Sequence, residues 1–138
     1  MSVLTTADVD TLVEAQGNDL IIPDGVTEIG VFAFFRSSAK DTITSVFIPD
    51  SVTSIGFYAF GSLSELKSID LGNGVESIGD SAFRDTQLTS VEMPNSVTSI
   101  GSHAFYGSPL TSVVIPDSVT SIGDSAFSGS QLTSVVIP

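Results

Sequence analysis

The chain has 138 residues, a net charge of −12 and no cysteine. Its length supports one domain with a continuous core, and the absence of cysteine excludes disulfides and thiolate metal sites. The negative field repels phosphate, and the apolar segments of the sequence are too short to span a bilayer. We therefore expect no nucleic-acid binding and no membrane insertion. No basic region followed by an apolar stretch marks a signal peptide at the N-terminus.

The first segment, residues 1–19, does not repeat and is expected to form an N-terminal cap. Apolar residues at i, i+3 and i+4 predict an amphipathic helix over about residues 6–16. Thr5 and Asp8 have the spacing of a capping box, and Gly17 is a natural stop. We expect this helix to cover the core of the first repeat, although it could instead dock another domain.

From residue 20 onward, one phrase recurs along the chain. Its clearest copy, Ile115 to Val136, reads IPDSVTSIGDSAFSGSQLTSVV. Counted backwards from the C-terminus, the steps between copies are 22, 22, 22, 23 and 26 residues. A period of this size indicates a solenoid whose units bury their apolar faces against one another. We expect five full coils and the start of a sixth over residues 20–138, with an uncapped C-terminus.

Two apolar columns separated by one residue predict a short strand in each coil, with both columns directed inward. Strands one coil apart should pair as a parallel sheet, with neighbours about 4.8 Å apart. The inward columns are Val46, Ile69, Val91, Val113 and Val135, and Ile48, Leu71, Met93, Ile115 and Ile137.

The rest of each coil also follows columns. A proline ends the strand in most coils, and an Asp or Asn then initiates a turn. A valine and an isoleucine three residues later form a second inward pair, followed by a glycine that permits either a bend or a close approach between coils. Finally, stacked phenylalanines should form a spine: Phe34, Phe60, Phe83, Phe105 and Phe127.

The pattern LxxVxIPxxVxxIGxxAF resembles the BspA-like (treponemal-type) leucine-rich repeats over about residues 20–138. The resemblance implies an α/β leucine-rich repeat fold, a strongly β-rich right-handed solenoid with a parallel concave sheet and a short N-terminal capping helix. It also implies a secreted or cell-surface protein that functions in binding or adhesion. The family usually carries a cysteine after the phenylalanine, whereas this chain has Leu63, Thr86, Ser108 and Ser130 at those positions.

No motif indicates catalysis, so we expect neither an enzyme nor a cofactor. The single histidine, His103, occupies a variable column and is expected to face solvent. The Asp and Asn column could hold calcium, but turn capping explains it without metal. A flat ice- or carbohydrate-binding array is disfavoured because Lys67 interrupts the threonine column.

The outward positions of the concave strands are the best candidates for binding. They place an acidic centre between apolar neighbours, with a lysine shortly before it. Such a face suits a protein or peptide partner that is cationic or amphipathic. The alternative is a solvated sheet without a ligand. The candidate residues are Phe47, Asp70, Glu92, Val114 and Lys67.

A second candidate surface concerns assembly. The insertion FFRSSAKDTI places Arg36 and Lys40 together, a basic spot that could meet the acidic side of another copy. In the last repeat, Val135 and Ile137 would lie at an open edge, so either the array continues or a partner copy covers it. We expect a monomer, or a homodimer through the C-terminal coil. The main functional prediction is a concave-face binding or adhesion module, and the alternative is a structural segment that assembles end to end.

Overall fold

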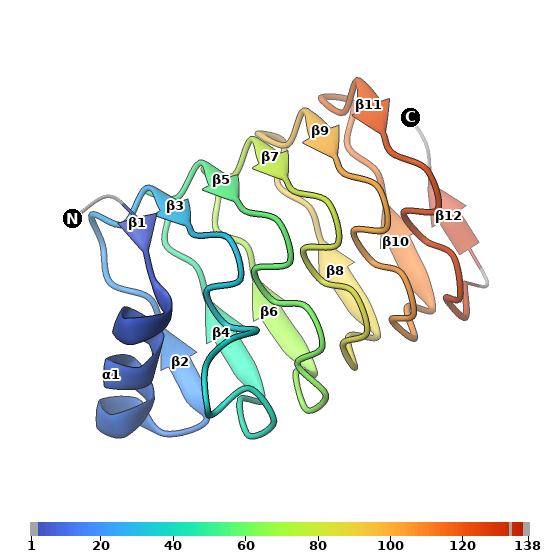
Figure 1. Cartoon of the computed structure of the whole chain (residues 1–138). Coiled ribbons are helices and arrows are strands. Elements are labelled where there is room, and N and C mark those ends of the chain that lie inside the picture. Colours follow the sequence, from blue (N-terminus) through green and yellow to red (C-terminus); the bar gives the residue numbers. More distant parts are fainter. Residues whose placement is uncertain (1–2, 133, 137–138) are drawn as a thin grey trace.

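A computed structural model describes residues 3–132 and 134–136, which wind into a parallel-sheet solenoid of about five coils (Figure 1). The helix lies at the N-terminal end and the strands stack in two rows. The predicted fold class is confirmed. The coils are numbered 1 to 5 from their first inward strand residue, which is in turn Leu20, Val46, Ile69, Val91 and Val113.

Two elements precede coil 1, a short strand β1 (Val3–Leu4) and the helix α1 (Thr6–Gln16). The predicted capping box is present, because the Asp8 carboxylate accepts from the Thr5 N–H at 2.9 Å and the Asp8 N–H donates to the Thr5 hydroxyl at 3.4 Å. The helix ends at Gly17, whose φ of +79° suits glycine. Its apolar side packs on the core next to coil 1, as expected of a cap.

The concave face is formed by one three-residue strand per coil. In each strand whose side chains are described, the middle residue points inward and the third residue is exposed. All pairs are parallel, with a register of one coil. The strands are β2 (Asp19–Ile21), β4 (Ser45–Phe47), β6 (Ser68–Asp70), β8 (Ser90–Glu92), β10 (Ser112–Val114) and β12 (Ser134–Val136).

The prediction of one continuous concave sheet is wrong at a single step. Strands β2, β4 and β6 form one sheet and β8, β10 and β12 form another, with no pairing between β6 and β8. At the same step the inward Ile69 is only half-buried, whereas Val46 and Val91 beside it are buried. The step that lacks strand pairing is therefore also the step at which an inward side chain is partly exposed.

A second parallel ladder lies on the return side of the coils, and this pairing was not predicted. It is continuous over six strands. After β1, a glycine follows each strand and permits close approach, because a Cβ at Gly79 would lie 2.7 Å from the Ile55 carbonyl oxygen. The strands after β1 are β3 (Glu28–Ile29), β5 (Ser54–Ile55), β7 (Ser77–Ile78), β9 (Ser99–Ile100) and β11 (Ser121–Ile122).

The predicted phenylalanine spine fills the interior. Successive rings stack with centroid separations between 4.4 and 5.5 Å from Phe34 to Phe127. At the family's cysteine positions, the Thr86 and Ser108 hydroxyls lie 2.9 Å apart, and Ser108 also donates to the Phe83 carbonyl. These buried hydroxyls are thus hydrogen-bonded, as burial requires.

One column adopts a left-handed backbone although it contains no glycine. The φ of His103 is +58°, and the φ values of its equivalents are between +56° and +58°. This conformation is unfavourable for residues with a Cβ. It directs the His103 N–H to the Asp124 carbonyl oxygen of the next coil at 2.9 Å. His103 is half-buried, 5.4 Å from the Tyr106 ring between centroids, so the prediction of a fully solvent-facing side chain was only partly right.

Candidate binding groove on the concave face

The outward residues of the concave strands combine exposed apolar side chains with carboxylates. Ile21, Phe47 and Val114 are 61%, 43% and 57% exposed. Asp70 and Glu92, also exposed, lie between Phe47 and Val114 along the face. Isolated apolar residues are ordinary on a surface, but here they follow one face of neighbouring strands.

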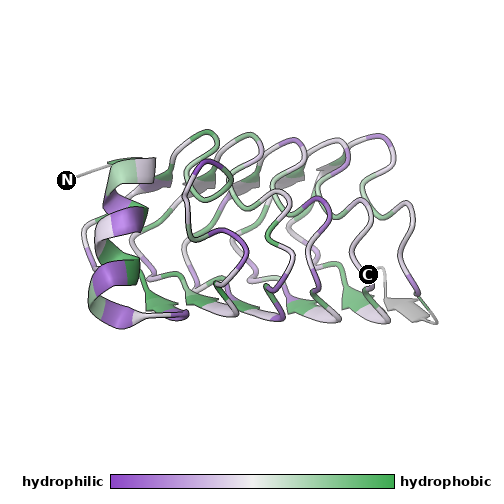
Figure 2. Cartoon of the chain, turned by 60° about the horizontal axis from the view of Figure 1, so that its bottom comes forward, coloured by the Kyte–Doolittle hydropathy of each residue, from purple (hydrophilic) through white to green (hydrophobic). Residues whose placement is uncertain are grey.

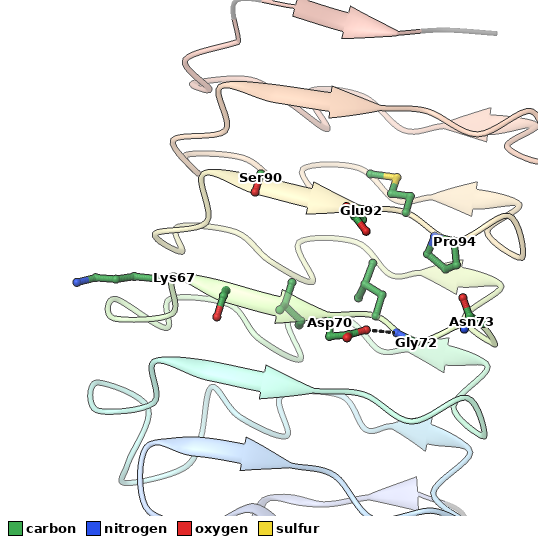
Figure 3. Close-up of a pocket in the computed structure, with 11 residues that line it drawn as sticks. Lys67, Asp70, Gly72, Asn73, Ser90, Glu92 and Pro94 are labelled. Carbon is green, nitrogen blue, oxygen red and sulfur yellow. Dashed lines mark hydrogen bonds between the residues drawn. The ribbon is translucent and has the colours of Figure 1, made fainter.

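Two depressions run along this face and meet. One has a volume of about 380 Å³ and lies between β6 and β8, where Lys67, Asp70 and Glu92 line it (Figure 3). The other, of about 340 Å³, lies over β2, β4 and β6 and includes Ile21 and Phe47. They share Ser68, Ile69 and Asp70, so together they form a single groove, here called the concave groove.

The missing ladder leaves backbone groups free in the middle of this groove. The Asp70 carbonyl accepts from the Ile48 N–H at 2.8 Å and therefore points towards β4. Alternate residues of a parallel strand bond to opposite neighbours, so Ile69 and Leu71 direct their backbone groups towards β8. Since β6 and β8 do not pair, donors and acceptors along both strands are available to solvent or to a partner.

Three local features coincide with the break. In a continuous register Asp70 and Glu92 would lie directly opposite, and like charges in such pairs are destabilising. Gly72, with φ +65°, replaces the strand-ending proline of other coils, and its N–H donates to the Asp70 carboxylate at 2.9 Å. The spacing of equivalent positions also changes at this step, from 23 residues to 22.

A further carboxylate, that of Asp19, lines the concave groove. The Asp19 carboxylate accepts from the hydroxyls of Ser45 at 2.7 Å and Thr44 at 3.0 Å, and these bonds lower the pKa of Asp19. Lys67 lies at the opposite end of β6 from Asp70 and points away from it, so it does not neutralise that carboxylate (Figure 3). The groove thus presents negative charge beside apolar side chains.

Sequence reasoning found the outward side chains of the concave groove but missed part of its lining. Gly72, Asn73 and Ser90 also line the depression between β6 and β8. A signal for these residues is present in the sequence, because glycine interrupts the proline column at position 72. That the interruption also separates two strands follows only from the three-dimensional arrangement.

Both basic residues proposed for assembly contact a neighbouring side chain of the same chain. The Arg36 guanidinium lies 4.6 Å from the centroid of the Phe32 ring in coil 1. The Lys40 ammonium pairs with Asp41 at 3.1 Å. This bond and one from the Ser64 hydroxyl lower the pKa of Asp41. The turns after β3, which carry both residues, lie at the opposite end of the solenoid from β12 (Figure 1). The side chain of Val135 and all of Ile137 lie outside the described residues.

Two further features concern the described residues as a whole. Within residues 3–132 and 134–136, no three acidic or histidine side chains converge in a way that could hold a metal ion. The helix in the same part of the chain is neither long nor apolar enough to cross a membrane.

Stacked coils with a parallel sheet on the concave side define a leucine-rich repeat solenoid. Residues 37–138 match the model of the BspA type leucine-rich repeat region, in six copies. The chain therefore belongs to the BspA-type leucine-rich repeat family, whose members commonly take part in protein interactions or associate with surfaces. A comparison with curated protein sequences found no significant match.

Solved structures support the same assignment. A leucine-rich repeat protein from T. pallidum is 32% identical with a TM-score of 0.81, and the match covers 88% of this chain and 59% of that one. A leucine-rich repeat protein from Bacteroides ovatus is also 32% identical, with a TM-score of 0.73 over 86% of this chain and 33% of that one. The pneumococcal vaccine antigen PcpA, 23% identical with a TM-score of 0.70, shares the fold. This chain thus spans only part of the length of these proteins.

Proposed function

We propose that this chain is a non-enzymatic binding module that holds an extended, cationic polypeptide segment in the concave groove. The observation that carries the proposal is the break between β6 and β8, which opens the groove and leaves backbone donors and acceptors unpaired within it. An extended segment can bond to such backbone groups while its side chains contact the flanking surface. Membership of a family in which protein interactions are common supports this choice.

Charge and apolar area define the chemistry of the partner. Asp70 and Glu92 attract lysine or arginine, and the net charge of −12 steers cationic segments towards the chain. Phe47 and Val114 flank these carboxylates and offer contact to apolar side chains. A segment that alternates basic and apolar residues can contact both the carboxylates and the apolar side chains of the groove. Family membership also supports a location at the cell surface or outside the cell, where such a module would serve in adhesion.

The proposal can be tested with synthetic peptides. A fluorescently labelled peptide of alternating lysine and valine should bind, whereas a glutamate–valine peptide should not, as measured by anisotropy near 0.15 M salt. The double variant D70N/E92Q should weaken binding of the lysine peptide by about tenfold, which corresponds to about 1.4 kcal/mol. Phe47→Ser should weaken it through the lost apolar contact.

A matched control removes the same charge elsewhere. The double variant D24N/D117N changes two exposed turn carboxylates outside the two groove depressions and should leave binding nearly unchanged. Equal binding of the two peptides, or an equal loss in the control, would show that only the net charge matters and that the concave groove is not the site.

A further inference from the structure

A second surface, away from the concave groove, gathers apolar side chains in coils 1 and 2. It consists of Val31, Phe32, Phe35, Phe57 and Tyr58, here called the aromatic patch. Phe32 is central, 5.3 Å from Phe57, 5.7 Å from Phe35 and 5.7 Å from Tyr58 between ring centroids. Val31 and Phe57 are 60% and 44% exposed, and the other three are half-buried.

The fold does not require these apolar residues. The column that holds Val31 in coil 1 and Phe57 in coil 2 continues as Asp80, Ser102 and Asp124 in coils 3 to 5. Those coils keep the continuous return-side ladder and the same left-handed turn with polar residues in this column. In Figure 2 the turns that follow β3 and β5 are coloured hydrophobic, and the later turns in the same row are white or purple. A reason other than folding is needed for an exposed aromatic cluster at this place.

Charged residues flank the patch in an arrangement of opposite signs. Arg36 in coil 1 stacks on Phe32, and among the described residues it forms no ion pair with an acidic side chain. The equivalent positions are Ser62 in coil 2 and Asp85 in coil 3. The Ser62 N–H donates to the Arg84 carbonyl oxygen at 2.7 Å, which keeps these coils in register. The side chain of Asp85 is 50% exposed, although it also lies 3.5 Å from the Arg84 guanidinium.

We propose that the aromatic patch is a face through which two copies of this chain associate about a two-fold axis. An axis across coil 2, perpendicular to the solenoid, brings coil 1 of one copy over coil 3 of the other. Arg36 then faces Asp85 of the second copy, and the symmetry repeats this contact. Phe57 and Tyr58 meet their own counterparts at the centre. Only this centre is apolar on both copies, as a two-fold contact requires, because Val31, Phe32 and Phe35 of coil 1 then lie over Asp80, Ser81 and Arg84 of coil 3.

Other occupants fit the same surface less well. Phe32 and Phe57 meet at 83° and Phe35 and Tyr58 at 70°, so the rings present edges rather than one flat shelf for a sugar. A strongly acidic partner would be repelled by a chain of net charge −12. A second copy has that charge too, but it supplies an apolar centre and an opposite charge at each end of the contact.

Sedimentation velocity tests the proposal on the whole chain. Dimer should form as concentration rises from about 10 to 500 µM, because interfaces of this small size give weak complexes. Phe57→Ser should abolish the dimer, and serine already occupies this column at Ser102, so the fold should tolerate it. Val114→Ser removes a comparably exposed apolar side chain from the concave face and should leave the dimer intact.

Charge exchange tests the symmetry. R36E alone and D85R alone should each be monomeric, because each places like charges opposite one another in its homodimer. An equimolar mixture of the two variants should dimerise, since both contacts in the mixed dimer pair opposite charges. K67E makes the same charge change away from the patch and should dimerise like the unmodified chain. Circular dichroism checks folding, and if D85R fails to fold, D85N mixed with R36E should form more dimer than either variant alone at the same total concentration.

Four outcomes would overturn the proposal. The unmodified chain could stay monomeric throughout the concentration range, or Phe57→Ser could dimerise as well as the unmodified chain. Loss of the dimer in Val114→Ser would move the interface to the concave face. A mixture of R36E and D85R that stays monomeric would exclude the two-fold arrangement.

Discussion

The two ladders of the solenoid are built from the same coils, yet one runs through six strands and the other divides between β6 and β8. From coil 2 onward the continuous ladder repeats serine, isoleucine and glycine at the same positions, so each strand meets an identical neighbour. The concave ladder varies at its outward position, where Asp70 and Glu92 come next to each other. Pairing in a repeat array therefore depends on what each strand meets one coil away, and not only on the repeat itself.

The largest expected effect comes from breaking the continuous ladder. A Cβ at position 79 would lie 2.7 Å from the Ile55 carbonyl oxygen, so Gly79→Ala must shift backbone. We expect a loss of about 1–3 kcal/mol, the usual range for overpacking. Urea unfolding measures it. Ser77→Ala in the same strand is the control, and a similar loss there would show that the ladder is generally sensitive and that close approach is not the cause.

A smaller and opposite effect should come from joining the divided ladder. Glu92→Thr removes the like charge opposite Asp70 and introduces a residue suited to strands, so stability should rise by about 0.2–1 kcal/mol. Hydrogen exchange should then slow at the β6 and β8 amides that face each other.

The control for this change lies beside the other ladder. Glu76→Thr removes one negative charge next to β7, where other coils already have threonine, and should leave exchange at β6 and β8 unchanged. If Glu92→Thr also leaves hydrogen exchange at β6 and β8 unchanged, charge repulsion does not cause the break between these strands. The Gly72 turn then becomes the better explanation.

The smallest effect concerns pH at the paired end of the concave ladder. The Asp19 pKa is lowered in the folded chain by the hydroxyls of Ser45 and Thr44. The resulting stabilisation is present above the unfolded pKa, near 3.9, and is lost as the pH falls through the lowered folded pKa. Asp19→Asn should therefore be slightly less stable than the unmodified chain at neutral pH, with the difference vanishing in acid. Urea unfolding at neutral pH and in acid measures this difference. Ser45→Ala, which removes one of the two hydroxyl donors, should also be less stable at neutral pH and lose the difference in acid. A difference that persists in acid would contradict the prediction.

Much of the architecture could be predicted because it repeats. The inward columns, the phenylalanine spine and the capping helix depend on local spacing, and among the described residues each was found as expected, except that Ile69 is half-buried. The second ladder was missed, because two-residue strands such as Ser77–Ile78 are too short to show alternation. The left-handed turn at His103 was missed too, since no glycine marks it.

Of the two candidate surfaces, one could be predicted from the sequence and the other could not. The outward position of Phe47, Asp70, Glu92 and Val114 follows from strand alternation, and their exposure agrees with it. The cluster around Phe32 could not be anticipated, because its members come from two coils and from both sides of the spine residue Phe34. Only the stacking of coils brings these rings together.

The sequence by itself determined the period, the inward faces and the membership of each column, because a solenoid converts residue spacing directly into position along a coil. The tertiary structure decided where coils meet imperfectly and which side chains gather across them. The break between β6 and β8 and the aromatic patch both arise between coils. The sequence could not predict them because cross-strand repulsion, turn geometry and ring contacts depend on distances of a few ångströms between coils. No single repeat specifies those distances.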